Sequence, residues 1–307
     1  MINLLLKAPI HSAPYFSDDV LKYLIPTSVT IFIFTLGLLT QWFKANLERR
    51  RQYRQLKNLF INWIPNLQKP IYTYAGNCDD FSARLTASER LSPESMAFIP
   101  LNAAKLANID INQLVKTFIY NSTGLQKENN EQLYYMVSNL EYLDDLHPEM
   151  EAKYNEHYTG TNSLMNEWNT AFIALSDLQV KVFNDQLPKS AARIALENDL
   201  RHNIVNWTAQ SQANPQNTVI TNNHLLVPNL QLLNNYFQQT QSEEQVVVDF
   251  TAALHRAAII FRQWRAGHEG YAIIFTNYGI KLRECYERIQ ASINYFEKET
   301  RINRICS

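Results

Sequence analysis

The stretch from Tyr23 to Phe43 constrains this chain most, because none of its 21 residues carries a charge. Lys22 and Lys44 flank it on either side. At about 1.5 Å per residue, a helix of this length extends roughly 31 Å, close to the thickness of about 30 Å of a bilayer's hydrocarbon core. The sequence therefore predicts a transmembrane helix over residues 23–43.

A cleaved signal peptide and a buried core helix are the two alternatives for this segment. A signal peptide has an apolar run of roughly 7 to 15 residues followed by small residues at the cleavage site. This run starts beyond residue 20 and ends in Gln41, Trp42 and Phe43. A soluble core helix is apolar on one face, whereas here large apolar side chains occur on every side of the helix. Both alternatives fit less well than a membrane span.

Aromatic residues mark the two ends of the span, since Tyr23 and Trp42 stand where amphipathic rings favour the headgroup layer. Pro26 leaves two starts open. In one, the helix begins at Pro26, because proline suits the first helical turn. In the other, residues 17–19 (Ser-Asp-Asp) cap an earlier start and the helix bends at the proline.

Basic residues are distributed unevenly around the span, and cytoplasmic flanks are the ones enriched in Lys and Arg. Only Lys7 and Lys22 precede the span. We therefore predict that the chain lies in the plasma (inner) membrane, with residues 1–22 as a short extracytoplasmic tail, residues 44–64 as a basic juxtamembrane helix and residues 65–307 as a cytoplasmic α-helical domain. Six basic residues follow the span closely: Lys44, Arg49, Arg50, Arg51, Arg54 and Lys57.

This basic segment has three interpretations: a topology signal, a contact with anionic lipid headgroups, or a nucleic-acid patch. The first two are compatible, because each Lys or Arg near an anionic surface is worth about 1 kcal/mol, and we predict headgroup contacts for all six residues. The formal net charge of the chain is −1 and residues 44–57 carry +5, which leaves about −6 on residues 58–307. Nucleic acid is therefore not an expected partner.

The cysteines Cys78, Cys285 and Cys306 follow no disulfide or metal-binding spacing, so we expect reduced cytosolic thiols. The glycosylation sequons at Asn121 and Asn206 are expected to stay unmodified in the cytoplasm. Only 7 glycines occur in 307 residues, and this scarcity leaves few positions for tight turns. Long helices are the simplest consequence.

Apolar residues recur at helical spacing through the rest of the chain, and the predicted fold class is an all-α, elongated bundle with coiled-coil-like hairpins. The helix that begins in the span is expected to continue to Pro65, and Pro70 opens the next one. Further helices are predicted over 92–100, 110–124, 133–148, 162–185, 188–214, 247–264 and 275–296, with one or two turns over 101–109.

Several of these boundaries depend on single residues or short motifs. Residues 92–94 (Ser-Pro-Glu) start a short helix, Asp110 caps another, and Pro148 ends a third. Residues 267–270 (Gly-His-Glu-Gly) are predicted to turn the last two helices into an antiparallel hairpin.

Residues 211–229 break the helical rhythm, because they are polar and rich in Asn and Gln. Three interpretations remain open: a flexible connector, a small β-hairpin across Asn222-Asn223, or a segment that contacts a partner.

Few patterns in the chain carry chemistry. Asp144-x-x-His147 and Asp199-x-x-His202 are the nearest approach to the Glu-x-x-His pairs of di-metal carboxylate sites. Two such pairs are unremarkable in a chain with 29 acids and 7 histidines. No glycine-rich phosphate loop, serine nucleophile elbow or cysteine signature occurs in the sequence. The sequence therefore predicts no catalytic residue, no metal site and no cofactor.

The remaining histidines and the tryptophans of predicted apolar faces are interpreted as structural. His255 lies among apolar residues of a predicted helix, and His268 lies in the predicted turn. For four tryptophans, core packing is the simpler interpretation and a ligand cage is the alternative: Trp63, Trp168, Trp207 and Trp264.

Three functions remain as hypotheses. The first is a membrane-tethered interaction or scaffold module without enzymatic activity, whose bundle binds a cytosolic protein or other copies of itself. The second is a membrane-disrupting effector of a toxin or phage-defence system, and the third is a di-metal carboxylate enzyme. The effector would require spans that pack through small or hydroxyl-bearing residues: Thr27, Ser28, Thr30, Thr35, Gly37 and Thr40.

Overall fold

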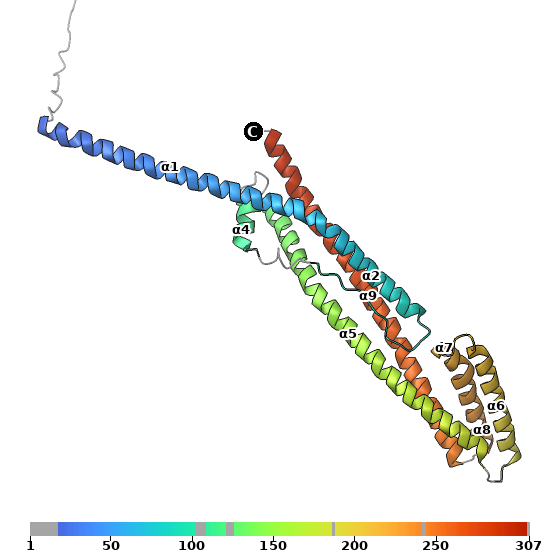
Figure 1. Ribbon diagram of the computed structural model, residues 1–307. Coiled ribbons are helices and arrows are strands. Elements are labelled where there is room, and N and C mark those ends of the chain that lie inside the picture. Colours follow the sequence, from blue (N-terminus) through green and yellow to red (C-terminus); the bar gives the residue numbers. More distant parts are fainter. Residues whose placement is uncertain (1–17, 102–108, 121–125, 186–187, 241–243, 306–307) are drawn as a thin grey trace, which may run out of the picture.

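The computed structural model describes residues 18–101, 109–120, 126–185, 188–240 and 244–305 (Figure 1). These residues are almost entirely helical, and no strand occurs among them. The all-α fold class predicted from the sequence is therefore confirmed.

Three long helices dominate the structure: α1 (Asp18–Trp63), α5 (Gln126–Asn184) and α9 (Gln245–Ile305). The shorter helices are α2 (Gln68–Ala87), α4 (Ile111–Val115), α6 (Ala191–Ser211), α7 (Thr218–Thr221) and α8 (Val227–Thr240). Single turns of other helix types connect them: a 3-10 turn, η1 (Ile64–Leu67), and two π-helical turns, η2 (Lys116–Tyr120) and η3 (Asn222–Leu226).

Helices α5 and α9 lie side by side in antiparallel directions and form the axis of the bundle (Figure 1). Tyr278 Oη donates a hydrogen bond of 2.9 Å to Glu149, and Ser292 Oγ donates one of 3.1 Å to Gln132. Residues further along α9 thus contact residues earlier in α5, as expected for antiparallel helices. With 59 and 61 residues, each helix extends roughly 90 Å.

Two hydrophobic cores follow one another along this pair. In the proximal core, nearer to α1, α2 packs on the C-terminal half of α9. In the distal core, α6 and α8 take the place of α2 (Figure 1). The largest fully buried side chains of the proximal core are Phe60, Tyr74, Phe81, Phe118, Phe275 and Phe296. Those of the distal core include Leu200, Leu226, Leu233, Phe250, Leu254 and Trp264.

Residues 88–101, called the strap here, contain no helix, so the helix predicted over 92–100 is wrong. The strap has two prolines, and side chains of α2 satisfy two of its backbone carbonyls. Arg84 Nη2 donates to Ser95 O over 2.6 Å, and Asn77 Nδ2 donates to Ala97 O over 3.0 Å. Bonds of this kind replace those that a helix would supply internally. The turns predicted over 101–109 lie largely outside the described residues.

Two predicted helix ends do not exist. Helix α5 continues through Pro148, although an interior proline removes a backbone hydrogen bond at a cost of about 3 kcal/mol. Its neighbours Leu146 and Met150 are both fully buried, and this burial outweighs the loss. Helix α9 likewise continues through residues 267–270. The predicted hairpin is therefore wrong, and the antiparallel partner of α9 is the distant α5.

Residues 212–217 form turns and residues 218–229 are helical, which corrects both the connector and the β-hairpin. Asn217 caps α7, because its side chain accepts a hydrogen bond from Ile220 N over 2.9 Å. The π-helical turn η3 then leads directly into α8, and it buries Leu225 and Leu226. The polar composition of this segment conceals short helical turns, of whose apolar residues Leu226 and Val219 pack in the distal core.

Other predicted boundaries are confirmed. Helix α1 continues from the apolar stretch to Trp63 without a break, and its start at Asp18 agrees with the earlier of the two predicted starts. Pro70 lies in the first turn of α2. Asp110 caps α4 by accepting a hydrogen bond from Asn112 N over 2.9 Å. Ser190 caps α6 in the same way through Arg193 N. The predicted stop at Gly124 lies outside the described residues.

We predict that Gly279→Ala destabilises the bundle by about 1 to 2 kcal/mol, the cost of overpacking less the gain in helix propensity. A Cβ at this position would lie 2.8 Å from Asp79 Oδ1 and 3.2 Å from Ala75 O, where α2 and α9 meet. Asp79 also pairs with Arg283, so a shift of its carboxylate would disturb this ion pair. The control is Gly76→Ala, whose Cβ meets nothing within 4 Å. Thermal unfolding of the full-length protein in detergent measures both, and equal melting temperatures would contradict the close approach.

Candidate functional site

Helix α1 is the described helix that is long and apolar enough to cross a membrane. Its apolar part leaves the bundle entirely (Figure 1), and the apolar window is unburied. Phe32 and Phe34 remain 65% and 68% exposed. Such a surface is unfavourable in water. Large exposed apolar areas of this kind mark contact with a partner or a membrane.

The hydroxyl groups of the span are bonded within α1 where the structure gives their partners. Thr35 Oγ1 donates to Ile31 O over 2.6 Å, and Thr40 Oγ1 donates to Leu36 O over 2.7 Å. Neither hydroxyl needs a second span to satisfy it. These contacts lend no support to span-to-span packing through these threonines.

The six predicted headgroup residues divide into two groups. Lys44 to Arg54 are exposed on the free part of α1, whereas Lys57 reaches back to the bundle. Lys57 Nζ lies 6.0 Å from the ring centre of Phe118 and 5.7 Å from that of Phe296. This contact is the cation–π type. Five exposed basic side chains therefore remain on the free part of the helix: Lys44, Arg49, Arg50, Arg51 and Arg54.

The two Asp-x-x-His pairs are not brought together. His147 lies on α5 beside the proximal core, where its ring centre is 5.6 Å from that of Tyr74, while His202 is exposed on α6. Among the described residues, no group of three or more His, Cys, Asp or Glu side chains is placed to hold a metal ion. Cys78 and Cys285 are buried free thiols, and burial raises the pKa of each to about 12.

Two histidines that face each other form a polar layer between the two cores. The ring centres of His157 (α5) and His268 (α9) are 5.1 Å apart, and both residues are at most 2% exposed. Trp264 Nε1 donates to His268 Nε2 over 2.9 Å, so this nitrogen carries no proton. The proton is therefore on Nδ1, which lies 3.3 Å from Leu85 O. His157 Nε2 is buried without a hydrogen-bond partner.

Burial holds both histidines neutral. It lowers the pKa of His157 to about 4, and together with the neighbouring His157 and Arg265 it lowers the pKa of His268 to about 4. Protonation of His268 would also place a hydrogen on Nε2 against the indole N–H. The layer is stable only with neutral rings, and nothing in it resembles an acid–base or metal site.

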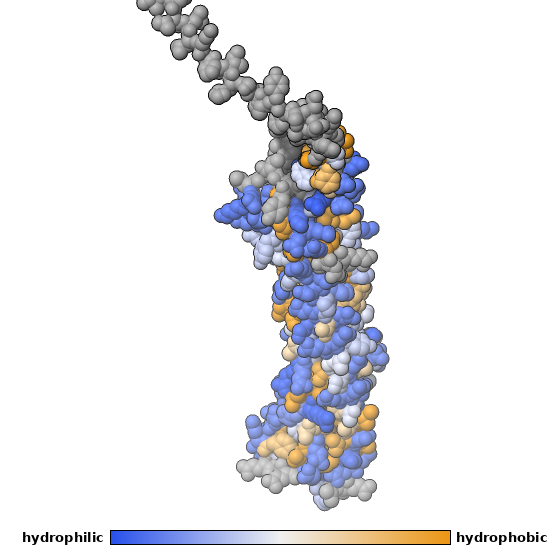
Figure 2. Space-filling view, turned by 90° about the vertical axis from the view of Figure 1, so that its left-hand side faces the viewer, coloured by the Kyte–Doolittle hydropathy of each residue, from blue (hydrophilic) through white to orange (hydrophobic). Residues whose placement is uncertain are grey.

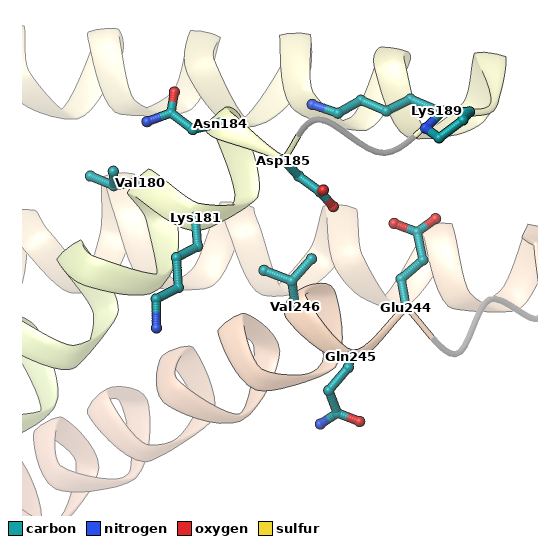
Figure 3. Close-up of a pocket in the computed structure, with 9 residues that line it drawn as sticks. Val180, Lys181, Asn184, Asp185, Lys189, Glu244, Gln245 and Val246 are labelled. Atoms are coloured by element: carbon teal, nitrogen blue, oxygen red, sulfur yellow. The ribbon is translucent and has the colours of Figure 1, made fainter.

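A cleft of 670 Å³ lies at the distal tip, between the end of α5 and the start of α9 (Figure 3). Four charged residues line it, Lys181, Asp185, Lys189 and Glu244, and the last two are used in ion pairs. Lys189 Nζ lies 2.7 Å from Glu197, and the buried Arg193 donates to Glu244 over 3.0 Å. Tyr236 Oη donates a further hydrogen bond to Glu244. The ion pairs of Lys189 and Glu244 stabilise the junction of the helices.

An apolar stripe runs along the outer side of α9, opposite its buried face. It repeats every seven residues, and its exposed members are Ala252, Ile259, Ala266, Ile273 and Ile280. Such outermost positions of a packed helix are ordinarily polar. The side of the bundle that Figure 2 shows is largely hydrophilic, with scattered hydrophobic residues. No described residue of the chain covers this stripe.

Sequence reasoning missed the histidine layer, the cleft and the outer stripe. The stripe was visible as a second seven-residue repeat beside the core repeat of α9. The layer was not, because His157 and His268 are 111 positions apart and belong to helices whose pairing the sequence did not predict. The cleft depends on the same pairing.

The histidine layer predicts acid lability. Both pKa values are near 6.5 in the unfolded chain and about 4 in the folded one. The contribution of each neutral histidine to the free energy of unfolding is thus complete above pH 6.5 and is lost as the pH falls toward 4. At pH 5 the loss is about 2 kcal/mol per histidine. We expect His157→Phe to lose less stability than the wild type between pH 6.5 and 5. The control is His202→Phe, a substitution at an exposed position, and stability is measured by thermal melting at each pH. An equal loss of melting temperature between pH 6.5 and 5 in all three proteins would contradict the assignment.

Comparison with protein-family models, with curated proteins and with solved structures finds no match to this chain.

Proposed function

We propose that the chain is a single-pass protein of the plasma (inner) membrane, with its N-terminal tail outside and its helical domain in the cytoplasm. The observation that carries this proposal is the free apolar part of α1, which is long enough to span a bilayer and unburied by the rest of the chain. The uneven distribution of Lys and Arg around this part supports the orientation.

The spacing along α1 supports lipid contact for most of the basic residues. Arg49 to Arg51 lie about 9 to 12 Å beyond Phe43 along the helix axis, within reach of the headgroup layer for long, flexible side chains. Arg54 lies about 16 Å beyond it, at the outer limit of that reach, and Lys57 is held against two phenylalanines of the bundle. We therefore assign the main headgroup contacts to Lys44 and the three consecutive arginines.

The domain itself acts as an interaction or scaffold module without enzymatic activity. Its support is the outer stripe of α9, which extends about 42 Å from Ala252 to Ile280. A stripe with a period of seven residues fits a partner helix that lies along it. The partner is a second copy of the chain or another cytosolic protein. No described feature favours the membrane-disrupting effector or the di-metal enzyme over this function.

The orientation predicts which cysteine a membrane-impermeant maleimide labels in intact cells. In a variant with Cys306→Ser, the buried Cys78 and Cys285 remain unreactive. We expect Ser17→Cys in the tail to be labelled from outside, and Ala195→Cys on α6 to be labelled only after permeabilisation. Labelling of Ala195→Cys in intact cells would refute the orientation. Recovery of the protein in the soluble fraction would refute the anchor as well.

The stripe predicts a protein contact at Ile273, which is 64% exposed. A photo-crosslinking amino acid at this position should form an adduct in membranes, and the mass of the adduct tells a second copy from another protein. The same probe at Ile194, an exposed residue of α6 with 51% exposure, is the control. Ile273→Glu should abolish the contact while changing the free energy of unfolding by no more than about 0.5 kcal/mol. If position 273 crosslinks no more than position 194, the stripe is not an interface.

A further inference from the structure

The junction between the two cores is built differently from the cores themselves. Along α9, the proximal core ends at Ala272 and the distal core resumes at Trp264. The layer between them contains His157, Thr161 and His268, all buried and polar. His157 Nε2 has no partner there. Such a layer holds the helices together less strongly than apolar packing does, because a buried polar group without a partner is unfavourable.

Glycines weaken both long helices at the same level. Gly160 follows His157 by three residues on α5, and Gly267 and Gly270 flank His268 on α9. An added Cβ at any of the three would meet nothing within 4 Å, so the packing of this chain does not require glycine there. Glycine has the greatest backbone freedom of all residues and is a poor helix former. The α5–α9 pair is therefore easiest to bend at the histidine layer.

A second connection joins the two parts beside this pair. Residues 89–91 of the strap contact the turn before α7, and we call these contacts the latch. Asn217 Nδ2 donates to Glu89 Oε2 over 2.7 Å, and Thr218 N donates to Glu89 O over 2.8 Å. Leu91 N donates to Thr218 Oγ1 over 3.0 Å, and the Leu91 side chain belongs to the distal core. The strap thus fixes the distal part from the side of α2.

We propose that the distal part, α6 to α8 with the adjoining halves of α5 and α9, bends against the proximal part about the histidine layer, and that the latch holds the straight form. The two long helices remain continuous during this motion, since both cores keep their own packing. The latch consists of a few hydrogen bonds and one leucine, so its opening does not require either core to unfold.

The proposal predicts distances between spin labels on the full-length protein in nanodiscs. One label pair crosses the layer, at Lys69→Cys and Ala195→Cys. A second lies within the proximal part, at Lys69→Cys and Glu287→Cys, and a third within the distal part, at Ala195→Cys and Arg256→Cys, which is outside the stripe. All of these positions are exposed. In the latch variant Glu89→Ala, Leu91→Ala, Thr218→Val, we expect the distance distribution of the crossing pair to widen about twofold, while the other two distributions keep their widths.

The glycines provide the second arm of the test. Gly160→Ala, Gly267→Ala and Gly270→Ala together should narrow the crossing distribution of the latch variant again, whereas the matched change Gly76→Ala on α2 should not. A crossing distribution that stays narrow without the latch would overturn the proposal. Widening of the distance distributions of all three pairs would also overturn it, because this result indicates general loosening. A crossing distribution that stays wide after the three glycine substitutions would overturn it as well.

Discussion

The antiparallel contact between α5 and α9 is the interaction on which the rest of the structure depends. Each of these helices contributes to both cores, while α2 and the pair α6–α8 each contribute to one. Neither shorter unit lies against enough surface to be stable alone, since most helical stability in proteins comes from tertiary packing. The α5–α9 pair offers a packing surface to α2 in the proximal core and a second one to α6 and α8 in the distal core. Because these surfaces follow one another along the pair, the bundle is elongated.

The sequence predicted helices where local signals and tertiary packing agree. Ser190 and Asp110 cap helices as expected because a capping side chain bonds to backbone groups within three residues. The span was predicted for the same reason: its evidence is contained in one contiguous stretch. The all-α fold class and the long apolar N-terminal helix therefore follow from the sequence.

Helix ends were mispredicted where packing overrides a local signal. Gly267 and Gly270 are turn residues by composition, yet Trp264 and His268 continue the buried face of α9 across them, one turn apart and hydrogen-bonded to each other. Pro148 is a helix breaker by composition, yet α5 buries Leu146 and Met150 on either side of it. In both places the deciding contact is with a helix more than 100 residues away. No local pattern records such a contact, and the candidate sites that depend on it were missed for this reason.

The outer stripe and the histidine layer are physically linked. The stripe crosses the layer, because Ala266 belongs to the stripe and lies two residues before His268. A partner helix seated from Ile259 to Ile280 would contact both the distal and the proximal half of α9. Its contacts on the two sides of the layer are compatible with one shape of α9 only. Binding along the whole stripe therefore favours that shape, by the difference in contact energy between the straight and the bent form. If the bound shape is the straight one, the partner and the latch act in the same direction and each raises the affinity or occupancy of the other.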